Sequence, residues 1–395
     1  MIQNLKLYVL LNSFGSHSIK VKLWTRTGCY QAMVPLDDSR PENVEKVKAM
    51  FTSIRPNFMG LNEEDWLSTD RFMNQLKPNR QPINPAITLA ISIASARAAT
   101  QNELWRIGGK NNVFPHIMGV VVKGKDWREF LLIPHKERTI TDAYHLLTEA
   151  WKITGEELKD KGVLRGRSLN GAWLSELGDV ETLYLLDQIA RDWNMKLGIN
   201  VGGSSLWDGS RYVYAKSKGL IVKKDLSAGE QMSLISAIME QYKIWYIEDP
   251  FRGGDFMSHA YLSQRMQESV VAGGDLYNAD ISRIKRAFKT RATKAITINS
   301  TQLPSISHMA EIKNFAKDKE LMLVLSRSHK ETEDTWLADL GVAFGTDMLK
   351  LGLGSDNVPK FNRLLEMWDD IPSPMMRTEP VQEKDYLVTS PSQPK

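Results

Sequence analysis

Polar side chains that could do chemistry follow short apolar runs at two places in the chain. The acidic pair Glu248–Asp249 follows the run Ile244–Ile247, and the stretch Arg327–His329 follows the run Leu321–Leu325. Carboxylates can hold a divalent cation, and arginine, serine and histidine together can bind an anion. The same side chains can also brace strand ends and the loops that follow them. The sequence therefore predicts either a small polar site at the ends of these runs or a set of structural braces.

The elements that must position these side chains are short apolar strands, each followed by a helix-like stretch. After Asn111 this pattern recurs, with strand-like runs at 196–201, 244–247, 270–272, 295–298 and 321–325. Repeated strand-then-helix units predict parallel strands with crossover helices, and this many units favours a closed β/α barrel over an open sheet. Sites in such barrels lie at the carboxyl ends of the strands, which is where the polar stretches stand.

The first 110 residues follow a different pattern. Residues 5–12 and 18–35 alternate apolar and polar side chains, which predicts β-strands in a hairpin or meander. From Pro41 to about Gln101 the spacing becomes helical, with an alanine-rich helix expected over Pro85–Ala99. The final residues are polar, rich in proline and without periodicity. We therefore predict a small α+β domain, a β/α barrel and a flexible polar tail, over residues 1–110, 111–375 and 376–395.

Composition limits the class of protein. The chain has 395 residues, 42% of them hydrophobic, which is enough for a large core in two or three domains. The formal net charge of +4 is spread along the chain, so composition gives no support for a nucleic-acid partner. The start lacks the apolar stretch of a signal peptide, and no apolar run is long enough to span a bilayer. With a single cysteine, Cys29, the chain is expected to be soluble and cytoplasmic, without a membrane partner.

Three motifs in the second half of the chain occur in the order in which one known family carries them. They are WYIEDPF at 245–251, ETEDTWLADL at 331–340, and LKLG followed by KFNRLLEM near Lys350 and Lys360. Upstream, REFLLIP at 128–134 and LGINVGGSSLWDG at 197–209 match further segments of the same family, and LNSFGSHSIKVKL near the amino terminus matches more weakly. On these motifs the chain resembles the enolase family over about residues 5–370.

The resemblance implies a small α+β domain that caps a β/α barrel, usually in a homodimer. It also implies an activity: the dehydration of 2-phosphoglycerate to phosphoenolpyruvate with two Mg²⁺ ions, a lysine base and a glutamate acid. The proton to be removed lies next to a carboxylate and is very weakly acidic. Divalent metal must therefore stabilise the enolate-like intermediate before a base can act.

The family's metal site uses three carboxylates, one at the end of each of three successive strands. In this sequence Asn200 stands at the first position, Glu248 at the second and Gly274 at the third. Mg²⁺ prefers charged oxygen ligands, which an amide and a glycine do not supply. We therefore expect no metal of the family type and no other cofactor.

The family's proton-transfer groups are also replaced. Asn299 occupies the position of the lysine base and cannot take a proton, while nearby Lys294 lies at the start of its strand, the wrong end of a barrel. The glutamate acid belongs to a loop that matches RGRSLNGAWL, where Leu169 stands instead. The resemblance therefore implies no intact catalytic set.

Some positions keep residue types that the family uses. Glu129 matches an acid-assisting glutamate and Lys350 a substrate-binding lysine, although a structural ion pair between them is an equally good interpretation. The stretch SRSHKETED keeps the residue types of the family's phosphate grip in altered order, and Ser39 matches the serine of a loop that covers the metals. The candidates for ligand binding are Ser39, Arg327, Ser328, His329 and Lys350.

Loss of the metal, base and acid positions together favours a pseudoenzyme, in which the enolase-like scaffold is a structural or interaction subunit of a homodimer or larger protein assembly. Two alternatives stay open. One is a divergent phosphopyruvate hydratase, which would need Mg²⁺. The other is a sensor that binds a small phosphorylated or carboxylated ligand without turnover, and anion-dependent thermal stabilisation would distinguish it.

Overall fold

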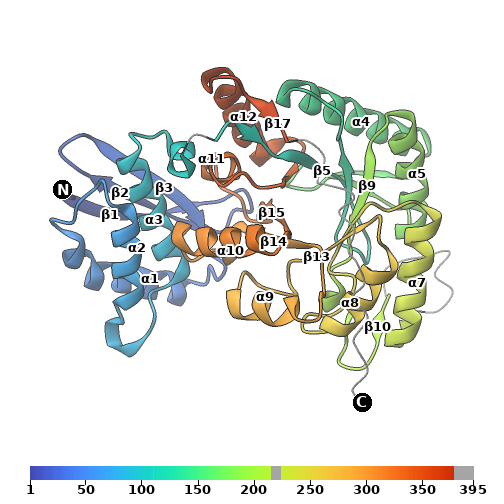
Figure 1. Cartoon of the computed structure of the whole chain (residues 1–395), viewed down its shortest axis with the longest axis horizontal. Helices are drawn as coiled ribbons and strands as arrows, with labels where there is room; N and C mark the ends of the chain where they lie inside the picture. Colours follow the sequence, from blue (N-terminus) through green and yellow to red (C-terminus); the bar gives the residue numbers. More distant parts are fainter. Residues whose placement is uncertain (110, 215–223, 378–395) are drawn as a thin grey trace, which may run out of the picture.

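The amino-terminal part of the chain forms the predicted α+β domain, at the left of Figure 1. The computed structural model describes all residues except 110, 215–223 and 378–395. Strands β1 (Asn4–Leu11), β2 (His17–Trp24) and β3 (Cys29–Pro35) form an antiparallel meander. The run 18–35 is therefore two strands, since the amide of Thr25 bonds the carbonyl of Gly28 and reverses the chain.

Helices cover one face of this meander. They are α1 (Pro41–Ile54), α2 (Trp66–Gln75) and α3 (Pro85–Ala99), with the 3-10 turns η1 (Arg55–Phe58), η2 (Pro78–Arg80) and η3 (Leu104–Gly108). Helix α3 has the predicted bounds. It starts at Pro85 because the side chain of Asn84 accepts a hydrogen bond from the amide of Ala86, and proline suits a first helical turn. Its small residues are buried on most sides, which lets it lie against β2, β3 and α2.

The rest of the chain forms the predicted β/α barrel. Within the described residues, eight strands close it in chain order, because β16 pairs back with β5. The strands are β5 (His116–Lys123), β6 (Glu129–Ile133), β9 (Lys196–Asn200), β12 (Tyr246–Glu248), β13 (Val270–Gly273), β14 (Ala295–Asn299), β15 (Met322–Ser326) and β16 (Met348–Gly352).

One strand differs from the expectation that all barrel strands are parallel. Strand β6 runs antiparallel to both β5 and β9. Only the short turn Gly124–Arg128 separates β5 from β6, and a parallel neighbour would need a crossover connection of a dozen or more residues. As a result the first residue of β6, Glu129, lies at the same end of the barrel as the last residues of the parallel strands.

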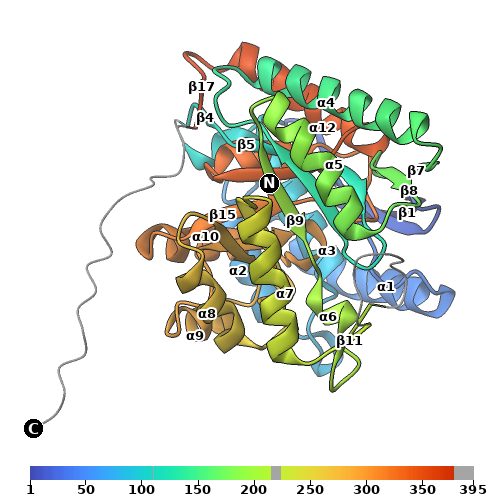
Figure 2. The same cartoon turned by 90° about the vertical axis from the view of Figure 1, so that its right-hand side faces the viewer.

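Helices surround the barrel strands, as Figures 1 and 2 show from two directions. They are α4 (Ile140–Asp160), α5 (Asp179–Asp192), α7 (Ala228–Gln241), α8 (Phe256–Arg265), α9 (Ile281–Phe288), α10 (Ile306–Asp318), α11 (Trp336–Ala343) and α12 (Val358–Asp370). The connections add α6 (Gly203–Leu206), η4 (Ser300–Gln302) and η5 (Ser355–Asn357), the hairpin of β7 (Leu164–Arg167) and β8 (Trp173–Ser175), and the pair β10 (Tyr212–Val213) and β11 (Asp225–Leu226).

The two domains are joined through the loop that follows β15. Asp334 in this loop accepts a hydrogen bond of 2.6 Å from Arg97 of α3 and one of 2.8 Å from the amide of Met33 in β3. The indole of Trp336 donates to the carbonyl of Met33 at 3.2 Å. Met33 and Trp336 are buried and the side chain of Asp334 is only 8% exposed, so the small domain is fixed against one end of the barrel by polar contacts largely shielded from water.

The ordered part of the barrel domain extends past the predicted boundary at residue 375. Strand β17 (Met375–Met376) pairs with β4 (Val113–Phe114), and Arg377 forms an ion pair of 2.9 Å with Asp347. The predicted tail, 376–395, overlaps this strand by one residue; residues 378–395 lie outside the described residues, so the flexible tail stays a prediction. Among the described helices, none is both long and apolar enough to cross a membrane.

Candidate functional site

Polar side chains from several strands meet at one end of the barrel. Asn200 at the end of β9 is in register with Glu129 on one side and with Glu248 on the other. Lys350 on β16 is in register with Ser326, the residue before Arg327. These side chains thus come from separate parts of the sequence and converge because their strands end at the same level.

Lys350 lies between the two glutamates. Its Nζ is 2.9 Å from each carboxylate oxygen of Glu248 and 3.2 Å from Oε2 of Glu129. Arg327 completes the group, with Nη2 3.1 Å from Oε1 of Glu129. The side chains of Lys350 and Arg327 are each only 4% exposed. Two buried cations therefore balance two carboxylates, and the predicted ion pair between Glu129 and Lys350 is part of a larger network, which we call the lysine–glutamate network.

The lysine–glutamate network keeps its members charged. Burial alone would raise the pKa of Glu129, but the charges of Lys350 and Arg327 outweigh it and lower that pKa to about 2. Burial would likewise lower the pKa of Lys350, but Glu248 and Glu129 outweigh it and raise that pKa above its ordinary value. Lys350 is therefore an ammonium group at neutral pH and cannot take up a proton.

Glu248 has further hydrogen-bond donors besides Lys350. Asn200 donates through Nδ2 at 2.8 Å, and the hydroxyl of Tyr246 donates at 2.7 Å. The Thr297 hydroxyl lies 2.9 Å from that of Tyr246 and 3.4 Å from the carboxylate itself. An ionised carboxylate has about four lone-pair sites, and those of Glu248 are taken by these donors. A metal ion at Glu248 would therefore have to displace the ammonium group.

The third position of the family's metal site, Gly274, faces a carboxylate that is already engaged. Asp249 accepts hydrogen bonds from the amides of Gly274, Asp275 and Leu276 at 3.0, 2.8 and 3.2 Å. Asp275 in turn pairs with Arg128 at 2.7 Å. Burial, followed by the charges of Glu248 and Asp275, raises the pKa of Asp249 to about 7. These carboxylates hold the turn after β13 against the end of β12.

Neither the position of the family's base nor that of its acid holds a proton-transfer group, and the nearby Lys294 lies at the other end of the barrel. Asn299 donates through Nδ2 to the carbonyl of Arg327 at 3.2 Å and accepts from the amide of Thr301 at 3.1 Å. Lys294 precedes β14 and donates to the carbonyls of Met266 and other residues before β13, so it lies at the opposite end of the strand, as expected. Leu169 is 47% exposed in the turn between β7 and β8. None of these three therefore supplies a proton-transfer group at the carboxyl ends of the barrel strands.

The structure keeps Arg327, Ser328 and His329 together, but most of their donors are already used. Arg327 donates to Glu129 and, at 2.6 Å, to the carbonyl of Ser328. The amide of Ser328 donates to Glu331, and its hydroxyl accepts from the amide of Lys330. The side chain of His329 is exposed. Partial desolvation, followed by the charges of Lys330 and Arg327, lowers its pKa below the ordinary value. Of the predicted anion-binding residues, His329 has the most freedom to contact a ligand.

Ser39 belongs to a segment that is tied down. Lys330 donates to the carbonyls of Leu36 and Asp37 just before it, and the imidazole of His17 lies 3.1 Å from the carbonyl of Ser39. The Ser39 hydroxyl itself makes only long contacts of 3.5 Å, to the carbonyls of His17 and Leu36. The segment is therefore anchored to the loop after β15 by residues that sequence reasoning did not single out.

Tyr246 and Thr297 are the site residues that sequence reasoning missed. Tyr246 is fully buried, and its pKa is raised well above the ordinary value by burial and by Glu248, so its hydroxyl remains a donor. The period of two in a strand could have identified it, because Tyr246 and Glu248 must point to the same side of β12. The same rule places Thr297 beside Asn299 on one face of β14.

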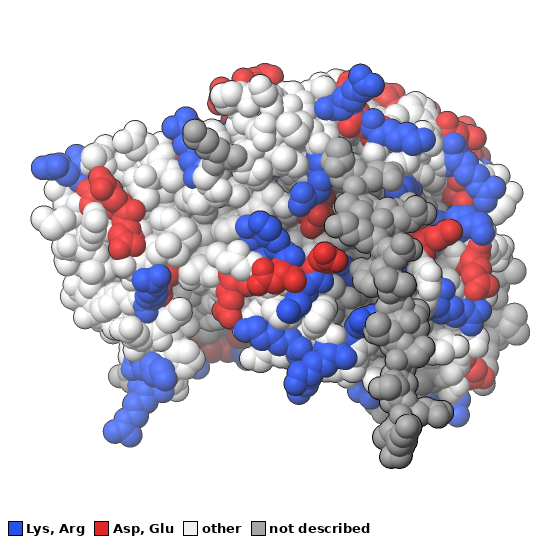
Figure 3. Space-filling model, viewed as in Figure 1, with Lys and Arg blue, Asp and Glu red and all other residues white. Residues whose placement is uncertain are grey.

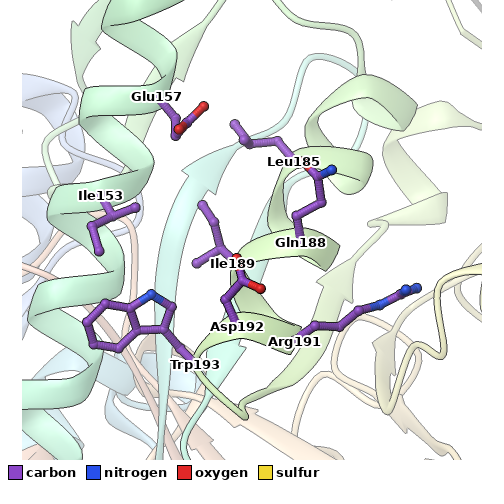
Figure 4. A pocket seen from close by; sticks show the side chains of 8 residues that line it. All are labelled: Ile153, Glu157, Leu185, Gln188, Ile189, Arg191, Asp192 and Trp193. Carbon is purple, nitrogen blue, oxygen red and sulfur yellow. The ribbon is translucent and has the colours of Figure 1, made fainter.

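A separate hollow lies on the outside of the barrel, between α4 and α5 (Figure 4). It has a volume of about 370 Å³ and is lined by Ile153 and Glu157 of α4 and by residues of α5 with the following Trp193. Its lining shares no residue with the lysine–glutamate network, so it is not part of the candidate site.

Comparison with known proteins agrees with the fold and the motifs. The family model described as the enolase C-terminal TIM barrel domain matches residues 121–376. The enolase of Archaeoglobus fulgidus is 25% identical over 403 residues, covering 95% of this chain and 99% of the relative. The enolase of Pyrobaculum aerophilum is 29% identical over 340 residues, or 80% of each chain, and that of Methanosarcina barkeri is 26% identical over 417 residues. The chain therefore belongs to the enolase family, whose C-terminal TIM barrel domain it carries.

Proposed function

We propose that this enolase-family chain does not catalyse the dehydration of 2-phosphoglycerate and acts as a structural or interaction subunit. The observation that carries the proposal is the position of Lys350, whose ammonium group lies 2.9 Å from both oxygens of Glu248. Glu248 is the carboxylate retained from the family's set of three, and its lone pairs are occupied by protein donors. The residues present do not fit the family's Mg²⁺ site.

The charge balance argues against a metal as well. A family-type site offers three negative charges to a divalent cation, whereas Asn200 and Gly274 offer none. The charge of Glu248 is matched by Lys350, and that of Glu129 is shared with Arg327. Adding Mg²⁺ to this neutral network would leave two uncompensated positive charges in a buried place, which is strongly unfavourable.

The positions of the family's base and acid also lack side chains that can transfer a proton. The base position holds Asn299, which is engaged with the backbone of Arg327 and Thr301, and the acid position holds the exposed Leu169. Without metal stabilisation, a base or an acid, the barrier to removing a proton next to a carboxylate stays close to that in water.

The experiment is an assay of phosphoenolpyruvate formation from 2-phosphoglycerate with excess Mg²⁺. The enolase of Archaeoglobus fulgidus, prepared in the same way, is the positive control, and a mock preparation gives the background. We expect the chain to give no rate above the mock preparation. Turnover above it, lost again in an Asn299→Ala or Glu129→Gln variant, would overturn the proposal and support the divergent hydratase.

A second candidate function for this site, a sensor that binds a small anion without turnover, stays a prediction. It is supported by the exposed His329 and by the exposed Lys123, whose charge acts on His329. Thermal stabilisation by phosphate or 2-phosphoglycerate without turnover would favour it. The homodimer and the cytoplasmic location also stay predictions, and light scattering of the purified chain tests the first.

A further inference from the structure

Helix α9 presents a row of cations to solvent on the outside of the barrel. Lys285, Arg286, Lys289 and Arg291 are exposed. Lys289, which caps the end of α9, is four residues after Lys285 and three after Arg286, so it is a neighbour of both on the surface, and Arg291 follows it. Ile284 and Ala287 are buried on the opposite face. Figure 3 shows blue side chains gathered at its lower centre, over the region where α9 lies in Figure 1.

Few of these charges are matched within the chain. Lys285 lies 3.5 Å from Glu311 in an ion pair in which both side chains are more than half exposed. Arg286 stacks over the ring of Phe256 at 5.3 Å. In the part of the chain that the structure describes, neither Lys289 nor Arg291 has an ion-pair partner. An exposed pair such as that of Lys285 adds little stability, so Lys285, Lys289 and Arg291 are available to an external anion.

Helix α8 adds an apolar edge to this row. Met257 is 69% exposed and Tyr261 is 56% exposed, and their spacing of four residues places them on one face of α8. The contact of Arg286 with Phe256, the neighbour of Met257, brings the two helices together, and Figures 1 and 2 both place α8 beside α9. Single exposed apolar residues are ordinary, but two of them beside unmatched cations make a mixed surface.

We propose that this α8–α9 face, formed by Lys285, Arg286, Lys289, Arg291, Met257 and Tyr261, docks an acidic segment of a partner protein that carries an apolar anchor. Such a segment satisfies both halves of the face, because its carboxylates pair with the cations while its anchor covers Met257 and Tyr261. The carboxylate of Glu311 would repel a continuous anionic surface such as lipid headgroups or a phosphate backbone. The proposal names a partner class for the interaction role proposed above and rests on that role.

The test uses the full chain and a fluorescein-labelled peptide of alternating glutamates with a central tryptophan and leucine, followed by fluorescence anisotropy. We expect the triple variant Lys285→Glu, Lys289→Glu and Arg291→Glu to weaken binding by about tenfold or more, and added salt to weaken binding to the original chain. The variant Met257→Ala with Tyr261→Ala should weaken binding by about threefold or more.

A matched control reverses three exposed cations of the small domain, Arg26→Glu, Lys46→Glu and Lys77→Glu, for which the described chain shows no ion pair. It has the same net charge as the first triple variant and should change binding by less than about threefold. Absence of peptide binding, equal loss in both triple variants, or tighter binding of a single-stranded oligonucleotide or of phosphatidylserine vesicles would each overturn the proposal. Turnover is measured separately, so failure here is distinguishable from failure of the proposed loss of catalysis.

Discussion

Lys350 is the residue on which the chemistry of this site depends most. Its ammonium group contacts Glu248 and Glu129, and all three side chains are largely buried. A buried ion pair is costly to form, but removing one partner is costlier, since the other charge stays buried without compensation. Lys350 is therefore the internal counter-ion of Glu129 and Glu248. Without it, these two buried carboxylates would lack most of their compensating charge.

Replacing Lys350 by methionine should destabilise the chain by about 3–5 kcal/mol, because Glu129 and Glu248 then lie in the barrel with only Arg327 to balance them. Urea unfolding followed by circular dichroism measures the change. The double variant Lys350→Met with Glu248→Gln is the control, and it should be more stable than the single variant by about 1 kcal/mol or more. If the free energy of unfolding of the single variant lies within about 0.5 kcal/mol of that of the original chain, the lysine–glutamate network does not contribute this stability.

At the residue scale, the sequence predicted which residues stand at the strand ends, but it did not predict which side chains form hydrogen bonds and ion pairs with one another. Asn200 and Glu248 are the last residues of β9 and β12, and Gly274 directly follows β13, as the sequence predicts. The pairing of Lys350 with Glu248 rather than with Glu129 alone was not expected, because the distance between two barrel strands depends on packing across the interior. Tyr246 was missed although its side of the strand follows from the period of two.

At the scale of elements, the contact between α4 and the β7–β8 hairpin depends on one glycine. A Cβ at Gly155 of α4 would lie 2.4 Å from the ring of Trp173, which stacks on Trp151 with centroids 4.7 Å apart. The indole of Trp173 also donates to the carbonyl of Trp151 at 2.7 Å. The hairpin that replaces the family's acid loop is thus held by a tryptophan that needs this glycine.

Gly155→Ala should therefore destabilise the chain by about 1–3 kcal/mol, as overpacking does, even though alanine suits a helix better than glycine. Gly229→Ala in α7 is the matched control, because a Cβ there meets nothing within 4 Å. It should be neutral or stabilising by up to about 1 kcal/mol. Thermal unfolding of both variants measures the effects, and equal stability of the two would contradict the packing described for Trp173.

The sequence predicts some features of the helices and strands better than others. The start of α3 follows from Asn84 and Pro85, which are local signals, and the helix covers the predicted residues Pro85–Ala99. The direction of β6 could not be taken from its apolar pattern, which is the same for a parallel and an antiparallel strand. The direction of β6 depends on the length of the turn Gly124–Arg128, which is too short for a parallel connection. That length can be measured only when the bounds of β5 and β6 are known.

At the scale of the whole molecule, the two domains share a buried polar junction. Asp334 bonds Arg97 and Met33, and the charge of Arg97 outweighs burial so that the pKa of Asp334 is lowered. Lys330 ties the segment before Ser39 to the same loop. The motif ETED was recognisable in the sequence, but Met33 and Arg97, the partners of its Asp334 in the small domain, are more than two hundred positions away and could not be predicted without the fold.

Because the ammonium group of Lys350 is paired with the carboxylate of Glu248, that carboxylate is not available to bind a metal ion. Calorimetric titration of the purified chain with Mg²⁺, in the presence and absence of 2-phosphoglycerate, tests it most directly, with the Archaeoglobus fulgidus enolase as the positive control. We predict heats no larger than those of dilution under conditions in which the control saturates. Saturable uptake of Mg²⁺ that is lost in a Glu248→Gln variant would contradict the claim, because it would show that the ammonium group leaves Glu248 free to bind metal.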